Sequence, residues 1–157
     1  MALTTESANR VRQKTYATLR NSGVQMELKG FFLNLAANKG NIDLQLVNID
    51  GNSMSSDGGA TQQVVCNGAC TLYVIYLKKV GSVANWFKLT DNATTCTTNG
   101  GQDLSLRTTT AADEKLLTWP IGFTMVNGIT LDENTTATGA TETLKANQQS
   151  GFAIIGA

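Results

Sequence analysis

Few residues in this chain have the types and spacing that catalysis requires. The 157 residues include no histidine, so an imidazole base, a Ser–His–Asp triad and a histidine metal ligand are all excluded. Two pairs of adjacent acids remain, Asp113-Glu114 and Asp132-Glu133. Neighbouring side chains on a strand point to opposite faces, so neither pair can act together, and we expect all four carboxylates to be solvated in turns. The sequence therefore predicts no catalytic residue, and we expect a protein that is not an enzyme.

The three cysteines, Cys66, Cys70 and Cys96, could form a disulfide or part of a metal site. Cys66 and Cys70 flank a turn at Asn67-Gly68, which would allow them to pair. An odd number of cysteines in a chain without an apolar signal segment favours free, buried thiols instead. Zinc is disfavoured because the spacing is too long and the chain has no histidine to complete the site.

One acidic loop resembles part of a calcium-binding loop. Asp50, Asn52 and Asp57 have some of the required spacing, but the central glycine and the terminal glutamate of an EF-hand are missing. No glycine-rich phosphate loop precedes a helix, since Asp57-Gly58-Gly59 lies among polar loop residues. The sequence therefore predicts no metal and no cofactor.

Composition excludes several classes of partner. Hydrophobic residues make up 41% of the chain and charged residues only 15%, and the formal net charge is zero. Because a neutral chain creates no global field, we expect no binding to nucleic acid or to an anionic membrane. No segment is long and apolar enough to span a bilayer, and none resembles an export signal, so we expect a soluble protein.

The segment 70–77 is the longest apolar run and organises the predicted fold. Its eight residues have the length of a strand and are rich in β-branched and aromatic types. Regular alternation would place Cys70, Leu72, Val74 and Tyr76 on one face and Thr71, Tyr73, Ile75 and Leu77 on the other. Both faces are largely apolar, so this strand needs a sheet on one side and a second layer or a second subunit on the other.

Residues 4–20 are the only segment for which the sequence predicts a helix. Thr4 or Thr5 can cap its start, and Asn21-Ser22-Gly23 can end it. A short helix with a thin apolar stripe is marginal alone, so it must pack either on its own domain or on a partner. The sequence thus predicts a basic helical arm over 1–23 and a β-sandwich domain over 24–157.

The arm supplies the candidate partner-binding residues. Val11 and Leu19 would provide an apolar grip, and the basic residues would meet an acidic surface. The complete set is Arg10, Val11, Arg12, Lys14, Leu19 and Arg20.

After Val24 the apolar residues alternate with a period of two, which is typical of strands. Residues 31–37 and 41–48 are predicted to pair as a hairpin, and Asn127-Gly128 predicts a second hairpin. Pro120 is expected where a strand ends or lies on a sheet edge. Further strands are predicted at 63–66, 83–89, 103–107, 115–119 and 152–155. Eight or nine short strands indicate an all-β fold, an antiparallel β-sandwich preceded by one N-terminal α-helix.

The stretch 70–131 resembles a family of small virion proteins of tailed bacteriophages. The resemblance is carried by the strand that runs into Lys78-Lys79, by segment 84–93 around Trp86-Phe87-Lys88-Leu89, and by segment 119–130 from Trp119-Pro120 to Ile129-Thr130. Members of this family are capsid decoration, cement or fibre modules with small jelly-roll sandwiches that often form trimers. The resemblance implies a jelly-roll fold and a homotrimer, although the basic N-terminal helix is not a regular part of the family pattern.

We expect a virion structural protein, a capsid decoration or cement protein made in the host bacterial cytoplasm and placed on the capsid surface. Its partners would be the major capsid protein and further copies of itself. An alternative with the same fold is a neck, tail or head-fibre module that binds a host glycan. A small carbohydrate-active enzyme or esterase is a third alternative, disfavoured by the lack of histidine and of a close acid pair. We expect Trp86 and Trp119 in the core, not on a sugar-binding platform.

Overall fold

The computed structural model describes residues 6–7, 10–14, 22–39, 42–54, 62–79, 81, 83–96, 103–109, 113–136 and 149–156. Its elements are β1 (Glu6–Ser7), α2 (Ser22–Lys39), β2 (Asp43–Asp50), the 3₁₀ helix η1 (Gly51–Met54), β3 (Gln63–Asn67), β4 (Cys70–Lys79), β5 (Asn85–Thr90), β6 (Leu104–Thr108), β7 (Glu114–Met125), β8 (Gly128–Asn134) and β9 (Gln149–Gly156). Residues 10–14 are also helical.

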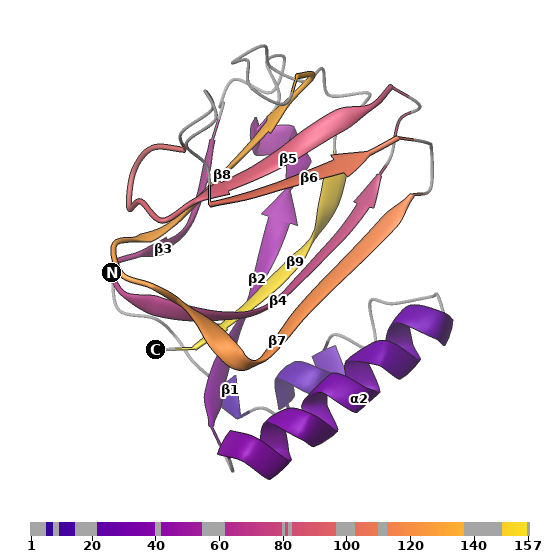
Figure 1. Ribbon diagram of the computed structural model, residues 1–157, viewed down its shortest axis with the longest axis vertical. Helices are drawn as coiled ribbons and strands as arrows, with labels where there is room; N and C mark the ends of the chain where they lie inside the picture. The colour runs from indigo at the N-terminus through magenta and orange to yellow at the C-terminus, as the bar shows by residue number, and fades with distance from the viewer. Residues whose placement is uncertain are drawn as a thin grey trace.

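The strands form two antiparallel sheets that face each other (Figure 1). The first sheet has the order β1-β2-β9-β4-β7, and the second has the order β3-β8-β5-β6. Pairing is nested along the chain, because β2 pairs with β9, β3 with β8, β4 with β7 and β5 with β6. One long antiparallel ribbon wrapped into two sheets has this nesting, which is the jelly-roll arrangement. The predicted all-β sandwich is therefore confirmed.

Two apolar layers cover the two faces of the first sheet. The core between the sheets includes Leu72 and Leu77 from β4 and Phe87 and Leu89 from β5. The layer on the outer face is built from the first sheet, from α2 and from the helical residues 10–14. Its buried members are Val11, Leu28, Phe31, Phe32, Leu35, Leu44, Tyr73, Val74, Tyr76, Phe152 and Ile154. The prediction that the central strand is covered on both sides is confirmed, and elements of the same chain supply the cover.

Helix α2 replaces strands that the sequence was expected to form, so the hairpin predicted from 31–37 and 41–48 is wrong. Leu28, Phe31, Phe32 and Leu35 have the spacing i, i+3, i+4, i+7, which places them on one face of a helix. All four are buried against the outer face of the first sheet, and Figure 1 shows α2 lying along that face beside β7. Tertiary burial of this face outweighs the local alternation.

The predicted N-terminal helix over 4–20 is observed only in part. Residues 10–14 are helical, but Glu6–Ser7 form β1, which pairs with β2 through Glu6 opposite Leu44. The remaining residues of 4–20 lie outside the described part of the chain. The predicted boundary between residues 23 and 24 falls inside α2. Apart from the short strand β1, which precedes α2, all strands of the sandwich follow α2, beginning with β2.

A β-bulge in β4 changes which residues face the core. The pairing of β4 with β9 shifts between Leu72 and Val74, so Tyr73 is an extra residue on the β4 side. Before the bulge the predicted face is correct, with Cys70 and Leu72 in the inner core. After it the predicted faces are exchanged, because Ile75 and Leu77 point inward while Val74 and Tyr76 point outward.

The signal at Asn127-Gly128 is correct as a turn but not as a hairpin, and Pro120 lies on a sheet edge as expected but does not end its strand. The turn at Asn127-Gly128 connects β7 of the first sheet to β8 of the second, so the predicted hairpin is wrong. Pro120 lies within β7, at the edge of the first sheet, where a missing N–H group breaks no ladder bond on the open side. Residues 119–122 leave the β4–β7 ladder, which resumes at Phe123.

Candidate functional site

The structure places the predicted partner-binding residues unevenly. Arg10 and Lys14 are exposed and Arg12 is half-buried, so the cationic side of the arm faces solvent. Val11 is 0% exposed and packs in the outer layer with Leu28 and its neighbours. Its side chain is therefore part of the domain's own core and offers no apolar grip to a partner. Leu19 and Arg20 lie outside the described residues.

Exposed apolar residues in the last part of β7 and directly after it form a second candidate surface, which sequence reasoning missed. Ile121, Phe123 and Val126, called here the β7 patch, are 73%, 41% and 67% exposed. The patch follows from the irregular ladder, because residues 119–122 leave the pairing with β4 and Gly122 has a positive φ of 84°. The only signal in the sequence was the combination of a proline and a glycine within an apolar run.

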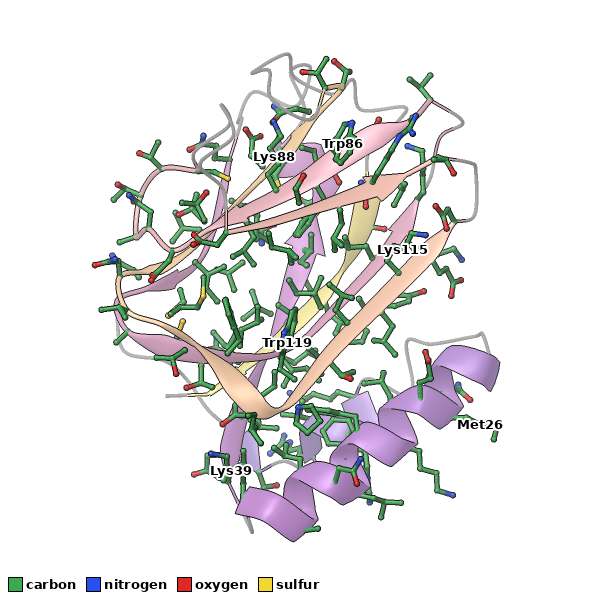
Figure 2. All side chains as sticks on the ribbon, viewed as in Figure 1. Met26, Lys39, Trp86, Lys88, Lys115 and Trp119 are labelled. Carbon is green, nitrogen blue, oxygen red and sulfur yellow. The ribbon has the colours of Figure 1, made fainter. Side chains whose placement is uncertain are left out.

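A small apolar cavity opens beside this patch. Its volume is about 150 Å³, and it is lined by Leu72, Leu89, Asp103, Leu104, Trp119 and Phe123. The rings of Trp119 and Phe123 lie 6.0 Å apart at an angle of 30°. Trp119 packs against the inner core but is only half-buried, and Figure 2 shows it on β7, the strand at the edge of the first sheet. The cavity can take an apolar side chain.

Asp91 fixes the turn that ends the β7 patch. Its carboxylate accepts hydrogen bonds from the backbone N–H groups of Val126 at 3.0 Å, Asn127 at 2.7 Å and Gly128 at 3.1 Å. Burial acts to raise the pKa of Asp91, but these three bonds outweigh it and lower the pKa. The patch therefore stands on a backbone that is held in place by a carboxylate, which favours a preformed surface.

Four charged side chains on β4, β5 and β8 are buried. Lys79 and Lys88 from β4 and β5, and Asp132 and Glu133 from β8, are all at most 1% exposed. The prediction that Asp132 and Glu133 are solvated turn acids is therefore wrong. Buried charges persist only where other groups satisfy them, and the two acids are satisfied in different ways.

Glu133 reaches across to the first sheet. Both of its carboxylate oxygens accept a hydrogen bond from the backbone N–H of Gln149 on β9, at 2.9 and 3.1 Å. Burial raises the pKa of Glu133 to about 8, although this hydrogen bond and the nearby charge of Lys79 act to lower it. Burial also lowers the pKa of Lys79, which Glu133 and Asp113 partly restore. This contact joins the two sheets.

Asp132 points away from Glu133, as neighbours on a strand should. Its carboxylate accepts hydrogen bonds from the backbone N–H of Glu133 at 2.8 Å and from Nδ2 of Asn134 at 3.3 Å. Burial raises the pKa of Asp132 to about 6, despite those bonds and the charge of Lys88. The charge of Asp132 also acts to raise the pKa of Glu133, so the two titrations are linked although the side chains lie on opposite faces of β8. Their hydrogen bonds are those of a buried structural network.

The described residues that the sequence offered for metal binding or for a disulfide form neither a metal site nor a cross-link. All three cysteines are free and buried, and the Sγ of Cys66 donates to the carbonyl oxygen of Gly68 at 3.2 Å. Among the described residues, no group of three or more Cys, Asp or Glu side chains is placed to hold a metal ion. Asp57 of the partial calcium loop lies outside those residues. No described helix is both long and apolar enough to cross a membrane.

Two larger hollows lie on the outer side of the first sheet. One of about 390 Å³ is lined by β2, β4, β7 and β9, with Lys78 and Glu114 among its residues. The other, of about 250 Å³, lies between α2 and β7 and is lined by Glu27, Gly30, Phe31, Asn34, Leu116, Thr118 and Pro120.

Comparisons with models of protein families, with curated proteins and with solved structures find no match to this chain.

Proposed function

We propose that the protein is a virion structural protein that decorates or cements the head of a tailed bacteriophage by binding its major capsid protein. The observation that carries the proposal is the jelly-roll strand order, because it agrees with the fold that the resemblance implies. Jelly-roll domains serve many functions, so the choice among them rests on the surface of this one.

The exposed surface supports binding better than catalysis. The acids with raised pKa values, Asp132 and Glu133, are both buried, at 1% and 0% exposure. The outward-facing features are the cations Arg10 and Lys14 and the apolar β7 patch. Burying one side chain of the size of Ile121 or Phe123 contributes about 1.5–3 kcal/mol. Cations beside an acidic capsid surface would add specificity and a faster encounter.

Cementing follows from repeated weak contacts between neighbouring capsid subunits. If several copies act together, as in the trimer that the resemblance implies, the second and third contacts form at a high effective concentration. No single contact then needs to be strong. The zero net charge of the chain suits close packing of many copies on one shell.

Charge reversal of the arm tests this proposal on capsid shells of the same phage that lack the protein. The double variant Arg10→Glu/Lys14→Glu changes two exposed side chains and should bind shells at least about 10-fold more weakly; because both residues also interact within the chain, thermal unfolding first checks that the variant is folded. Lys29→Glu/Lys39→Glu makes the same change of charge on exposed residues of α2 and should bind like the wild type. Equal binding by both double variants would refute the role of the arm.

Deletion of the arm would not test the proposal cleanly. Removal of residues 1–22 would also remove β1 and the buried Val11, and would expose the outer apolar layer. Loss of binding by such a deletion would then report unfolding as readily as loss of an anchor. Reversal of exposed charges avoids this ambiguity.

A second candidate function is a neck, tail or head-fibre module that binds a host glycan. The half-buried Trp119 stacked near the exposed Phe123 favours it, because aromatic faces commonly pack against apolar faces of ligands. The number of copies in each virion separates the two functions. Hundreds of copies would support decoration of the head. About a dozen copies or fewer would support the appendage, provided that the protein also binds a glycan array and that Trp119→Ala abolishes this binding.

A further inference from the structure

Helix α2 carries a second apolar stripe on the side opposite to its buried face. This outer stripe consists of Met26, Gly30, Leu33 and Ala37, all of them exposed, with Met26 75% and Leu33 60% exposed. Figure 2 shows Met26 on the side of α2 that is turned away from the sandwich. Spacings of four, three and four residues are those of the a and d positions of a coiled coil.

A helix that packs only on its own domain needs one apolar stripe. Leu28, Phe31, Phe32 and Leu35 already provide it, and they are buried on the first sheet. Apart from Gly30, which also borders the hollow between α2 and β7, the outer stripe takes no part in that packing, and its exposure leaves apolar area in water over about three turns of helix. Isolated exposed apolar residues are common, but four in heptad register on one helix face indicate an association surface.

The shape of the outer stripe selects a second copy of α2 as its occupant. Gly30 has no side chain, and a Cβ added there would meet nothing within 4 Å, so the helix surface has a shallow hole at this point. Leu33 is a large side chain less than one turn away. In an antiparallel pair, Leu33 of the second copy sits over Gly30, and Ala37 of the second copy sits over Met26. Each layer then matches a large residue with a small one, which fills space efficiently.

A parallel pair or a three-fold bundle fits less well. Either arrangement places equivalent residues opposite each other, so Gly30 would face only other copies of Gly30. That layer would leave a void at the centre of the contact, which costs packing energy. The antiparallel two-fold pair alone among these arrangements covers the hole and is closed by symmetry.

The charges beside the outer stripe are compatible with the antiparallel pair. Glu27 and Asn34 flank one side of it, while Lys29 and Ala36 flank the other. In an antiparallel pair, each side of the outer stripe meets the same side on the second copy, which runs in the opposite direction. Glu27 therefore lies beside Asn34 of the second copy. Lys29 then lies beside Ala36 of the second copy. No like charges meet, and the Asn34 amide can donate to the carboxylate of Glu27.

We propose that α2 is a self-association helix through which two copies of the chain pair antiparallel, with their outer stripes in contact. The pairing is independent of binding to a capsid, so it can fail or succeed whatever the fate of that proposal. One helix pair buries less than the roughly 1,600 Å² of a standard interface. The dissociation constant is therefore expected on the order of 10 µM.

Sedimentation velocity of the full chain over about 1 to 200 µM tests the pairing without any particle. The wild type should shift from one chain towards two, and Leu33→Glu should raise the dissociation constant by at least about 10-fold. Val83→Glu makes the same change at an apolar residue that is 50% exposed and lies outside α2, and it should pair like the wild type. Met26→Glu repeats the test if Leu33→Glu folds poorly.

Disulfide trapping tests the orientation. An equal mixture of Met26→Cys and Ala37→Cys proteins should give an oxidised heterodimer, while neither variant alone should cross-link to itself. The three native cysteines are buried and serve as the internal control. A wild type that stays monomeric to 200 µM, pairing that survives Leu33→Glu, or self-cross-linking of Met26→Cys alone would each overturn the proposal. A monomeric wild type whose Leu33→Glu variant loses shell binding would assign the stripe to the capsid and also overturn it.

Discussion

Replacing Glu133 by glutamine is expected to remove most of the dependence of stability on pH between about 4.5 and 8. The carboxyl group of Glu133 is buried between the two sheets, and burial raises its pKa from 4.5 to about 8. A group whose pKa is raised by folding contributes stability that is fully present below its unfolded pKa. That contribution is lost as the pH rises through the folded pKa. The wild type should therefore be most stable in mild acid.

The size of the effect follows from the same two pKa values. Each pH unit between 4.5 and about 8 corresponds to about 1.4 kcal/mol, so the upper bound is about 5 kcal/mol. Asp132 acts in the same direction over a lower window, because burial raises its pKa from 3.8 to about 6. Domains of this kind unfold with about 5–15 kcal/mol, so even half of the upper bound is a large fraction of the total.

Lys79 contributes with the opposite sign. Burial lowers the pKa of Lys79, and the charges of Glu133 and Asp113 oppose this. A lysine with a lowered folded pKa contributes stability above its unfolded pKa of 10.5, and that contribution is lost as the pH falls through the folded pKa. The upper end of its window is therefore near 10.5, and because its sign is opposite, Lys79 can only reduce the loss of stability that Glu133 causes as the pH rises.

Urea unfolding at pH 5, 7 and 9, followed by tryptophan fluorescence, measures the effect. Glu133→Gln keeps the shape of the side chain and an oxygen that can accept from the N–H of Gln149, but it cannot ionise. Its free energy of unfolding should match the wild type at pH 5 and exceed it by several kcal/mol at pH 9. Glu27→Gln, at an exposed position of α2, should follow the wild type throughout. Parallel pH profiles for the wild type and Glu133→Gln would refute the reasoning.

Four further outcomes are expected from packing, backbone conformation, hydrogen bonding and burial. Gly151→Ala should destabilise the protein by roughly 1–3 kcal/mol or more, because a Cβ there would overlap the backbone carbonyl of Tyr76. Gly30→Ala, where an added Cβ meets nothing within 4 Å in a single chain, should instead stabilise the monomer by about 1 kcal/mol, and thermal unfolding at a protein concentration well below the dissociation constant of the pair compares the two. Asp91→Ala should cost about 1 kcal/mol through loss of three backbone hydrogen bonds, measured in the same way. A thiol reagent at pH 8 should label none of the three buried cysteines before unfolding and all three in urea.

The central ribbon and most strand positions could be predicted from the sequence because they depend on local length and residue type. Segment 70–77 was predicted to be a doubly covered strand, and it lies between two apolar layers. Its faces after Leu72 were predicted wrongly because the bulge at Tyr73 depends on pairing with β9. A single extra residue exchanges the two faces of a strand, and no local signal marks where it will fall.

Helix α2 could not be separated from a strand by alternation alone. The segment 24–37 satisfies a period of two, yet Leu28, Phe31, Phe32 and Leu35 also satisfy the helical period. The outer stripe is apolar as well, so apolar residues occur on both sides of the helix. This makes the sequence of α2 resemble the alternating pattern of a strand. The need for cover on the outer face of the first sheet settles the choice, and that need is known only once the sheet is built.

The buried acids were missed because residue type favours exposure. Aspartate and glutamate are almost never fully buried unless they are paired. Their partners here come from distant parts of the chain, Gln149 for Glu133 and the charge of Lys88 for Asp132. Adjacency in sequence correctly predicted that the two side chains diverge, but not that both would point into protein.

The docked arm restricts how a partner can use it. Val11 is buried with Leu28 in the outer layer, so lifting residues 10–14 away would expose an apolar side chain at a cost of about 1.5–3 kcal/mol. It would also open the apolar layer beneath. A capsid that met Arg10 and Lys14 in place would avoid that cost and would find both cations already fixed on the domain. Binding by a docked arm therefore predicts that hydrogen exchange of residues 10–14 slows or stays unchanged on particles. A peeled arm would exchange faster at Leu28 and Phe31, where the outer layer loses its cover.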